Sequence, residues 1–385
     1  MSLSQIRIEE VRAYFKHQDY ALAFRRLLDC AMDTQDMAVY SAAIKLTAAR
    51  EQHKEAIDPA WVAACLELLE QIAAIPLQAG NTNDAVIAGE KLSKVYGHSG
   101  FALGPISVQI RKGQVYGLVG ENGNGKTTLL RILARELFYN QGHINYTFSK
   151  APADDYDLRS KLVYIPQRTQ KWYGSLQDNL KFVLASYGLK PQEIETRVLM
   201  MIARLGLWNY KELKWHQLSS GYKMRFELAR TLLRQPEVML LDEPLANLDI
   251  LAQQMILEDL KYISNSITNP IALILSSQQL YEVEKVSDKV IFLKNGKYNQ
   301  QEQEQKEQSE RKLIIEMDVN SNKERLREVL SGLALEKLTF NGGQFIAQFS
   351  DPVTFSQVLQ TLGHSELEIV YIRNISSSSR RFFVA

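Results

Sequence analysis

The stretch VYGLVGENGNGKTTLLRIL, residues 115–133, constrains the fold more than any other part of this sequence. An apolar run typical of a strand leads into Gly120, four residues follow, and Gly125, Lys126 and Thr127 open a helical pattern. Glycines at this spacing let the backbone fold its N–H groups around phosphates. The lysine can then reach the β- and γ-phosphates, and the threonine can hold Mg²⁺. The sequence therefore predicts a phosphate-binding loop (P-loop) between a strand and a helix of an α/β fold.

A second apolar run, EVMLLDEP, ends in two carboxylates, Asp242 and Glu243. Adjacent residues on a strand face opposite ways, so we expect the two side chains to have different roles. Asp242 is interpreted as the carboxylate that supports Mg²⁺. Glu243, past the strand end, is interpreted as the base that orients and deprotonates an attacking water. With the P-loop upstream, this strand end indicates an ATPase.

A third feature is the helix start in HQLSSGYKMRFELAR, where Ser219, Ser220 and Gly221 precede an amphipathic helical pattern. Free backbone N–H groups and the helix dipole make such a start an anion site. The sequence thus carries two candidate phosphate sites that are far apart along the chain.

Together, the P-loop, the acidic strand end and LSSGY at residues 218–222 resemble the nucleotide-binding subunit of an ABC transporter. The signature of that family is LSGGQ, and the variant with Ser220 and Tyr222 is similar to its ABC-2 exporter branch. The resemblance spans residues 85–298. It implies that the signature contacts the γ-phosphate of ATP held by the opposite subunit, so that two copies, a homodimer, close around two nucleotides. The implied reaction is ATP hydrolysis coupled to a separately encoded polytopic membrane permease of the export type.

The resemblance also implies residue roles. Tyr96 would stack on adenine, although a tyrosine there could equally fill a core, and Gln278 stands where the family has a histidine. A neutral amide cannot carry an imidazolium charge, so we expect slow or partner-dependent hydrolysis. The implied catalytic residues are Lys126, Gln167, Glu243 and Gln278; those implied for ATP are Tyr96, Gly120, Glu121, Asn122, Gly123, Asn124, Gly125, Lys126, Thr127, Thr128, Ser219, Ser220, Gly221 and Asp249; those implied for Mg²⁺ are Thr127, Gln167 and Asp242.

The chain is expected to contain more than this cassette. Residues 1–80 show helical periodicity and predict an all-helical domain, with Asp58 and Pro59 as a helix start. Residues 85–298 predict the cassette, a mixed sheet with a helical subdomain. The run at 299–311 has no apolar residue and is interpreted as a polar linker. Residues 312–385 follow the order strand, helix, two strands, helix, strand, which predicts a ferredoxin-like α+β domain.

Composition limits the partners. The formal net charge of +1 provides no general field for nucleic acid, and no apolar run reaches the length of a membrane span. We therefore expect a cytoplasmic protein, and the resemblance implies that it is peripheral on the inner face of the cell membrane through its permease. Two other readings remain open: a non-transport ABC ATPase that acts as a mechanical clamp, and a regulatory protein that uses ATP as a slow switch.

Overall fold

The computed structural model describes residues 2–52, 57–82, 84–97, 101–148, 150–152, 154–279, 283–298, 313–341, 343–350 and 352–376. The chain divides into two compact units, described here one at a time. The first comprises Met1–Gln278 and Val286–Lys297, and the second comprises Gln279–Lys285 and Tyr298–Ala385.

The first unit begins with four helices, which we call the N-terminal bundle. Side chains at their starts explain where they begin: Ser2 forms a capping box with Gln5, Asp19 accepts from the N–H of Leu22, and Asp58 caps the last helix. The helices are α1 (Leu3–Lys16), α2 (Tyr20–Thr34), α3 (Met37–Gln52) and α4 (Pro59–Ala73). Because the bundle and the cassette form one compact unit, the predicted domain boundary at residue 80 remains a prediction.

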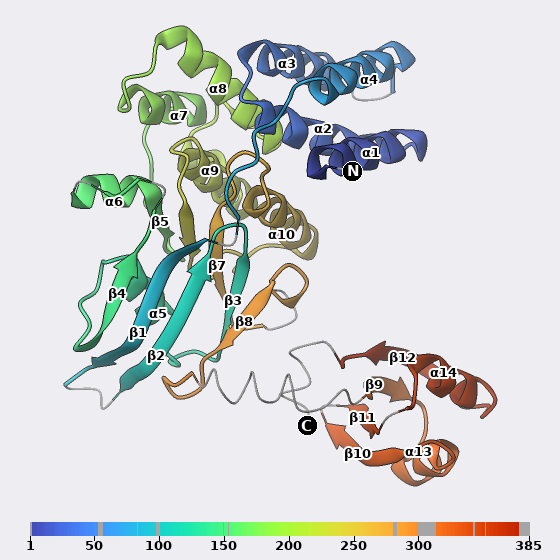
Figure 1. Ribbon diagram of the computed structural model, residues 1–385. Helices are drawn as coiled ribbons and strands as arrows, with labels where there is room; N and C mark the ends of the chain where they lie inside the picture. The colour runs from blue at the N-terminus through green and yellow to red at the C-terminus, as the bar shows by residue number, and fades with distance from the viewer. Residues whose placement is uncertain are drawn as a thin grey trace. The chain divides into compact units, whose positions relative to one another are not determined.

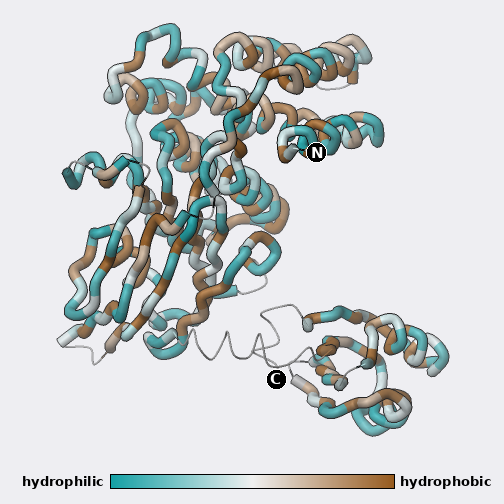
Figure 2. Tube along the Cα trace, viewed as in Figure 1, coloured by the Kyte–Doolittle hydropathy of each residue, from teal (hydrophilic) through white to brown (hydrophobic). Residues whose placement is uncertain are grey.

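The centre of the first unit is a parallel sheet with the strand order β5-β6-β7-β3-β8 among the described residues (Figure 1). Strands β3, β6 and β7 are buried along their whole length, as expected for apolar strands covered on both faces. Figure 2 shows the hydrophobic character of these inner segments. The strands are β3 (Val115–Val119), β5 (Leu162–Ile165), β6 (Val238–Leu241), β7 (Ala272–Ser277) and β8 (Lys289–Phe292).

A separate antiparallel sheet has the order β2-β1-β4, with β1 at Ala85–Val95, β2 at Ala102–Arg111 and β4 at Gln141–Tyr146. The sequence predicted one mixed sheet, whereas these strands form two sheets of different type. The burial pattern explains the difference: β2 alternates buried and exposed residues, as an antiparallel strand with one open face does. The strands of the parallel sheet have no exposed face of this kind at β3, β6 or β7.

Helices complete the first unit. Helices α5 (Lys126–Leu133) and α10 (Ile250–Ser264) follow strands β3 and β6 in the chain, and α10 packs on β7. We call the segment from α7 to α9 the helical subdomain. It follows α6 (Asp155–Lys161) and contains α7 (Leu176–Ala185), α8 (Pro191–Arg204), the short 3₁₀ helices η1 (Trp208–Tyr210) and η2 (Trp215–Gln217), and α9 (Ser220–Leu232).

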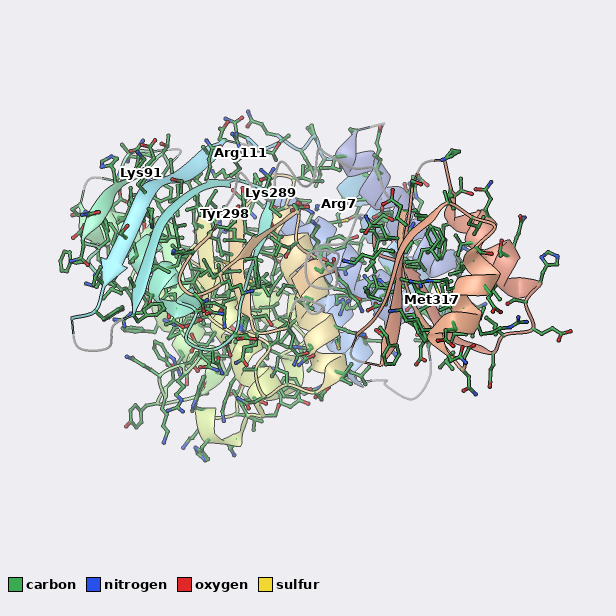
Figure 3. All side chains as sticks on the ribbon, turned by 90° about the horizontal axis from the view of Figure 1, so that it is seen from below. Arg7, Lys91, Arg111, Lys289, Tyr298 and Met317 are labelled. Atoms are coloured by element: carbon green, nitrogen blue, oxygen red, sulfur yellow. The ribbon has the colours of Figure 1, made fainter. Side chains whose placement is uncertain are left out.

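The second unit is built on a four-stranded sheet with the order β10-β11-β9-β12, in which all neighbours are antiparallel. Its core gathers apolar side chains from strands and helices, among them Met317 on β9 (Figure 3). The predicted linker at 299–311 lies outside the described residues. The elements are β9 (Leu313–Val319), α13 (Lys323–Leu330), β10 (Leu335–Asn341), β11 (Gln344–Phe349), α14 (Phe355–Gly363) and β12 (Ile369–Asn374).

Candidate functional site

The loop between β3 and α5 is closely packed at its glycines and leads into an uncapped helix start. Gly123 and Gly125 have positive φ angles of 83° and 96°, which favour glycine. A Cβ on Gly120 would lie 2.5 Å from the carbonyl oxygen of Leu293, and a Cβ on Gly125 would lie 2.6 Å from Leu103 Cδ1. In the described chain no side chain caps α5, so its first N–H groups are left for an anion.

Lys126 is held under this loop. Its side chain is only 5% exposed, and its Nζ donates to the carbonyl oxygens of Gly120 at 2.6 Å and Glu121 at 3.3 Å. The same Nζ lies 3.5 Å from Oε1 of Glu243. The lysine therefore links the P-loop to the end of β6 and places a positive charge where phosphates would bind.

Asp242 is enclosed by hydroxyl groups. Its Oδ2 accepts from Thr127 Oγ1 at 2.8 Å and from the hydroxyl of Tyr164 at 3.1 Å, and its Oδ1 accepts from Ser276 Oγ at 2.8 Å. Burial raises the pKa of Tyr164, and the negative charge of Asp242 raises that pKa further, so the tyrosine remains a neutral donor. Hydroxyl, carboxylate and amide oxygens are the ligands that Mg²⁺ prefers, so Thr127, Asp242 and Gln167 fit this ion.

Glu243 is the point on which three donors converge. Its carboxylate accepts from Gln278 Nε2 at 2.9 and 3.2 Å and from Gln167 Nε2 at 3.1 Å, in addition to its ion pair with Lys126. The residue has a positive φ of 48°, and its backbone N–H donates to Ser276 Oγ at 2.8 Å. Strain of this kind in a non-glycine residue is typical of functional sites.

These groups open into one cavity of about 560 Å³, which is within the range of small-molecule sites. The rings of Tyr96 and Phe101 lie at its edge with centroids 6.2 Å apart, and the Tyr96 hydroxyl is 3.4 Å from Thr128 Oγ1. The cavity is lined by Tyr96, Phe101, Glu121, Asn122, Gly123, Gly125, Lys126, Thr127, Thr128, Gln167, Glu243 and Gln278. Of the other predicted P-loop residues, Gly120 accepts from Lys126 Nζ through its carbonyl oxygen, and Asn124 accepts from the N–H of Asn295 through its side chain.

The predicted signature residues lie elsewhere. Ser219 caps α9 by accepting from the N–H of Tyr222 at 3.4 Å, and Ser220 Oγ donates to the carbonyl oxygen of Asn247 at 2.8 Å. Asp249 caps α10 in the same way, accepting from the N–H of Ala252 at 2.9 Å. None of Ser219, Ser220, Gly221 and Asp249 is among the described residues that line the cavity. One copy of the chain thus keeps its two candidate phosphate sites apart.

Sequence reasoning missed three residues of the site. Tyr164 and Ser276 both donate to Asp242, and Phe101 lies beside Tyr96 at the cavity edge. A hydroxyl at the end of an otherwise apolar strand, as in IALILSS, is a signal that could have indicated Ser276. Tyr164 and Phe101 carry no comparable pattern.

Comparisons with known proteins agree with this geometry. The family model described as "ABC transporter" matches residues 103–246. An uncharacterised ABC transporter ATP-binding protein of Methanocaldococcus jannaschii is 31% identical over 212 residues, 54% of this chain and 74% of that protein. The phosphate import ATP-binding protein PstB of Saccharolobus solfataricus is 32% identical over 205 residues, 50% of this chain and 78% of that protein.

A solved structure gives the same result for the fold. CbiO1 of Clostridium perfringens, which is part of the ABC transporter complex CbiONQ, matches with a TM-score of 0.51 and 27% sequence identity. The match covers 56% of this chain and 87% of CbiO1. The P-loop cassette fold predicted for the centre of the chain is therefore confirmed.

Proposed function

The chain belongs to the ATP-binding proteins of ABC transporters, and from this premise we propose that two copies close around two ATP molecules to drive a separately encoded, polytopic membrane permease. The observation that carries the proposal is the separation of the two phosphate sites. The P-loop cavity holds a lysine and a strained glutamate, whereas Ser219 and Gly221 start a helix outside that cavity. A second copy would bring its helix start to the open side of the first copy's nucleotide.

The residues in the cavity and Asp242 at the end of β6 divide the work in the proposed reaction. The P-loop N–H groups and Lys126 bind the phosphates, and Tyr96 packs against the adenine ring. Thr127, Asp242 and Gln167 would hold Mg²⁺, which would neutralise phosphate charge when bound. Arriving phosphates compete with Glu243 for the Lys126 ammonium, because that ammonium is 3.5 Å from the carboxylate.

Glu243 is the proposed general base. Once its contact with Lys126 is weakened, its carboxylate can orient a water molecule and accept its proton. Gln278 donates to both oxygens of this carboxylate, at 2.9 and 3.2 Å, and therefore competes with the water. Because an amide stays neutral at every pH, it cannot be released from the carboxylate by deprotonation. This competition supports the proposal that hydrolysis by the purified chain is slow.

The direction of transport is a finer proposal. Export follows from the resemblance of LSSGY to the ABC-2 branch, yet one of the relatives described above is named as a phosphate import protein. We keep export as the prediction, and the signature variant is the observation that supports it. ATP-dependent uptake into inverted membrane vesicles tests export, and accumulation in right-side-out vesicles would contradict it.

We assign the second unit to the ferredoxin-like class. Its sheet has the order β10-β11-β9-β12 and is antiparallel throughout. Along the chain, α13 lies between β9 and β10, and α14 lies between β11 and β12. Its proposed role is to pair with its copy in the homodimer while the cassettes are open. Deleting the residues after Lys312 should then shorten the dimer lifetime, and an unchanged lifetime would contradict this role.

The proposed location is the inner face of the cell membrane, through the permease. Among the residues that the structure describes, no helix is both long enough and apolar enough to cross a membrane. The test of the function is purification of the tagged full chain from detergent-solubilised membranes. A polytopic protein that copurifies and raises ATPase activity supports the proposal. Full ATPase activity without a membrane partner would favour the non-transport alternative.

A further inference from the structure

The N-terminal bundle shares a hydrophobic core with the helical subdomain. Met200 and Ala203 of α8 are buried in the same apolar cluster as Leu27, Tyr40 and Leu69 of the bundle. Both α2 and α3 pack directly on α8. The bundle is therefore built onto the element that precedes the signature helix, and is not attached only by its connecting chain.

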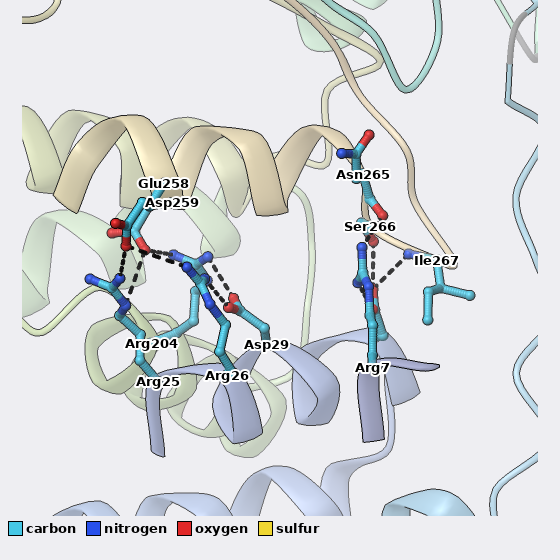
Figure 4. A network of polar contacts seen from close by, with 11 residues as sticks. Arg7, Arg25, Arg26, Asp29, Arg204, Glu258, Asp259, Asn265, Ser266 and Ile267 are labelled. Atoms are coloured by element: carbon cyan, nitrogen blue, oxygen red, sulfur yellow. Dashed lines mark hydrogen bonds and ion pairs between the residues drawn. The ribbon is translucent and has the colours of Figure 1, made fainter. Parts of the chain in front are cut away.

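The same bundle is tied to the core of the cassette by buried charge (Figure 4). Arg204 of α8 forms an ion pair with Asp29 of α2 at 2.5 Å and lies 3.6 Å from Asp259 of α10. The side chains of Arg204 and Asp259 are each 3% exposed. Burial raises the pKa of Asp259, and the neighbouring arginine opposes that rise. This arginine thus connects α2 and α10 to α8 through buried charge.

Two further arginines of α2 reach α10. Arg25 forms an ion pair with Glu258 and lies 3.8 Å from Asp259. Arg26 forms an ion pair with Asp29 at 2.8 Å and lies 3.6 Å from Glu258. Helices α2, α8 and α10 are therefore connected by a closed ring of charges, in which every helix contacts the other two.

A second anchor lies at the end of α10. Asp33 of α2 accepts from Ser266 Oγ at 2.6 Å and from the N–H of Ile267 at 3.1 Å. It also pairs with Arg7 of α1 at 2.7 Å, and Arg7 donates to the carbonyl oxygen of Asn265. The bundle therefore contacts α10 at two separate places, at Glu258 and Asp259 within the helix and at residues 265–267 directly after its end.

A third contact extends to the signature itself. Asn209 Nδ2 donates to Glu51 Oε2 of α3 at 2.6 Å. The ring of the adjacent Tyr210 lies against the ring of Tyr222, with centroids 3.8 Å apart and an interplanar angle of 31°. Tyr222 follows Ser219 by three residues and donates its N–H to that serine. A continuous series of contacts therefore joins α3 to the serine that caps α9.

From these contacts we propose that the N-terminal bundle is an intramolecular brace that positions the signature helix α9 relative to the core that holds the P-loop. The inference rests on the proposed closure of two copies around ATP. In that closure the signature of one copy must meet a nucleotide bound to the core of the other. A rigid angle between α9 and α10 in each copy removes a conformational cost of closure, so the brace favours the closed dimer.

The test compares full-length variants in a Glu243→Gln background, where we expect ATP dimers to be long-lived because hydrolysis is blocked. Tyr210→Ala removes the ring contact and Asn209→Ala removes the bond to Glu51, whereas Tyr210→Phe keeps the ring and serves as the matched control. The expected result is an approximately ten-fold rise in the ATP concentration for half-maximal dimerisation, about 1.4 kcal/mol, with Tyr210→Ala and Asn209→Ala. Tyr210→Phe should dimerise like the parent. ATP affinity of the monomer should change less than about two-fold, because the P-loop cavity is not altered.

Arg25→Ala provides a second, independent variant, since it removes one of the two arginines by which α2 reaches α10 and does not touch the signature. It should weaken dimerisation in the same direction, and it should add less than its full effect to Asn209→Ala if both act through the brace. Dimerisation that is unchanged or easier in Tyr210→Ala and Arg25→Ala would overturn the proposal. A loss that only follows a fall in the melting temperature would also overturn it.

Hydrogen exchange of the monomer separates this inference from the proposed function. The brace predicts faster exchange at residues 219–223 in Tyr210→Ala and Asn209→Ala than in the parent or Tyr210→Phe. Unchanged exchange there would contradict the brace whatever the dimer does. Failure of the parent chain to dimerise with ATP would contradict the proposed function alone, because the exchange measurement requires no dimer.

Discussion

Two helices of this protein begin with sites suited to phosphate, and they begin in different ways. Helix α5 starts after Gly125, at a positive φ of 96°, and among the described residues no side chain caps it. Helix α9 starts at Ser219, whose hydroxyl oxygen accepts from the N–H of Tyr222. The first start leaves its N–H groups for a ligand, whereas the second satisfies one of its own and still has a hydroxyl proton to donate.

The difference indicates how the work is divided. The uncapped start of α5, with the buried Lys126 beside it, can bind phosphate within one chain. A start that is already capped is stable alone and adds a contact only when a ligand is brought to it. The following variants break or sharpen this division, in order from the largest expected effect to the smallest.

Glu243→Gln should have the largest effect on turnover. Loss of a general base costs on the order of 10²–10⁴-fold, and the glutamine keeps the size of the side chain. ATP binding should persist, and the protein should accumulate as an ATP-bound dimer. Steady-state phosphate release and light scattering measure the two quantities. Hydrolysis within ten-fold of the parent would identify a different base, and ATP binding without dimers would mean that α5 acts alone.

Lys126→Ala should remove the positive charge that supports phosphate binding at the start of α5. Removing one donor that stabilises transition-state charge costs about 10²–10³-fold in turnover, and loss of the lysine's positive charge should also lower ATP affinity. Fluorescent-nucleotide titration checks the affinity. Lys297→Ala is the matched control, because it removes a lysine from an exposed turn outside the cavity. Equal losses in both variants would contradict a specific role for Lys126.

Ser219→Ala should affect only the capped start. The variant loses an N-cap, which costs about 1 kcal/mol of stability, and loses the hydroxyl proposed to meet the partner's ATP. ATP-driven dimerisation should therefore weaken by about ten-fold, a loss of about 1.4 kcal/mol. Nucleotide affinity of the monomer should stay unchanged.

Ser219→Asn is the control for stability, since asparagine also caps helices well. It should restore the melting temperature and leave dimerisation weak. A monomer affinity that falls with Ser219→Ala would show that the two helix starts serve one nucleotide within the same chain.

Gln278→His should have the smallest effect, a gain of a few-fold in turnover. An imidazole can carry a positive charge toward the γ-phosphate and titrates near neutral pH, unlike the amide that now bonds to Glu243. Turnover measured between pH 6 and 9 in the assembled complex checks this. No increase at any pH would contradict the proposal that Gln278 limits hydrolysis.

The predictability of this molecule depends on the distance between interacting residues along the chain. The P-loop follows from a local spacing between a strand and a helix, and Asp58 with Pro59 marked the start of α4 for the same reason. The fold of the cassette was therefore predictable from short patterns. Its division into two sheets was not, because that division depends on which strands pair and on which faces remain exposed.

Contacts between residues far apart in the sequence were missed because no local pattern indicates them. Tyr164 donates to Asp242 across 78 positions, and Arg25 of α2 meets Glu258 across 233. Single charged residues on amphipathic helices look like solvent-facing positions in a sequence. Only the packing of α2 on α8 and the ion pairs between α2 and α10 show that some of them, such as Arg204, form a buried network.

The most direct test of the account is the structure of the full-length Glu243→Gln dimer with ATP and Mg²⁺. The account predicts that the γ-phosphate lies on the P-loop of one copy, at Gly125–Lys126–Thr127, within about 3 Å of Ser219 Oγ from the other copy. A closed, nucleotide-loaded dimer in which Ser219 faces solvent, or in which one chain surrounds its own ATP completely, would contradict it.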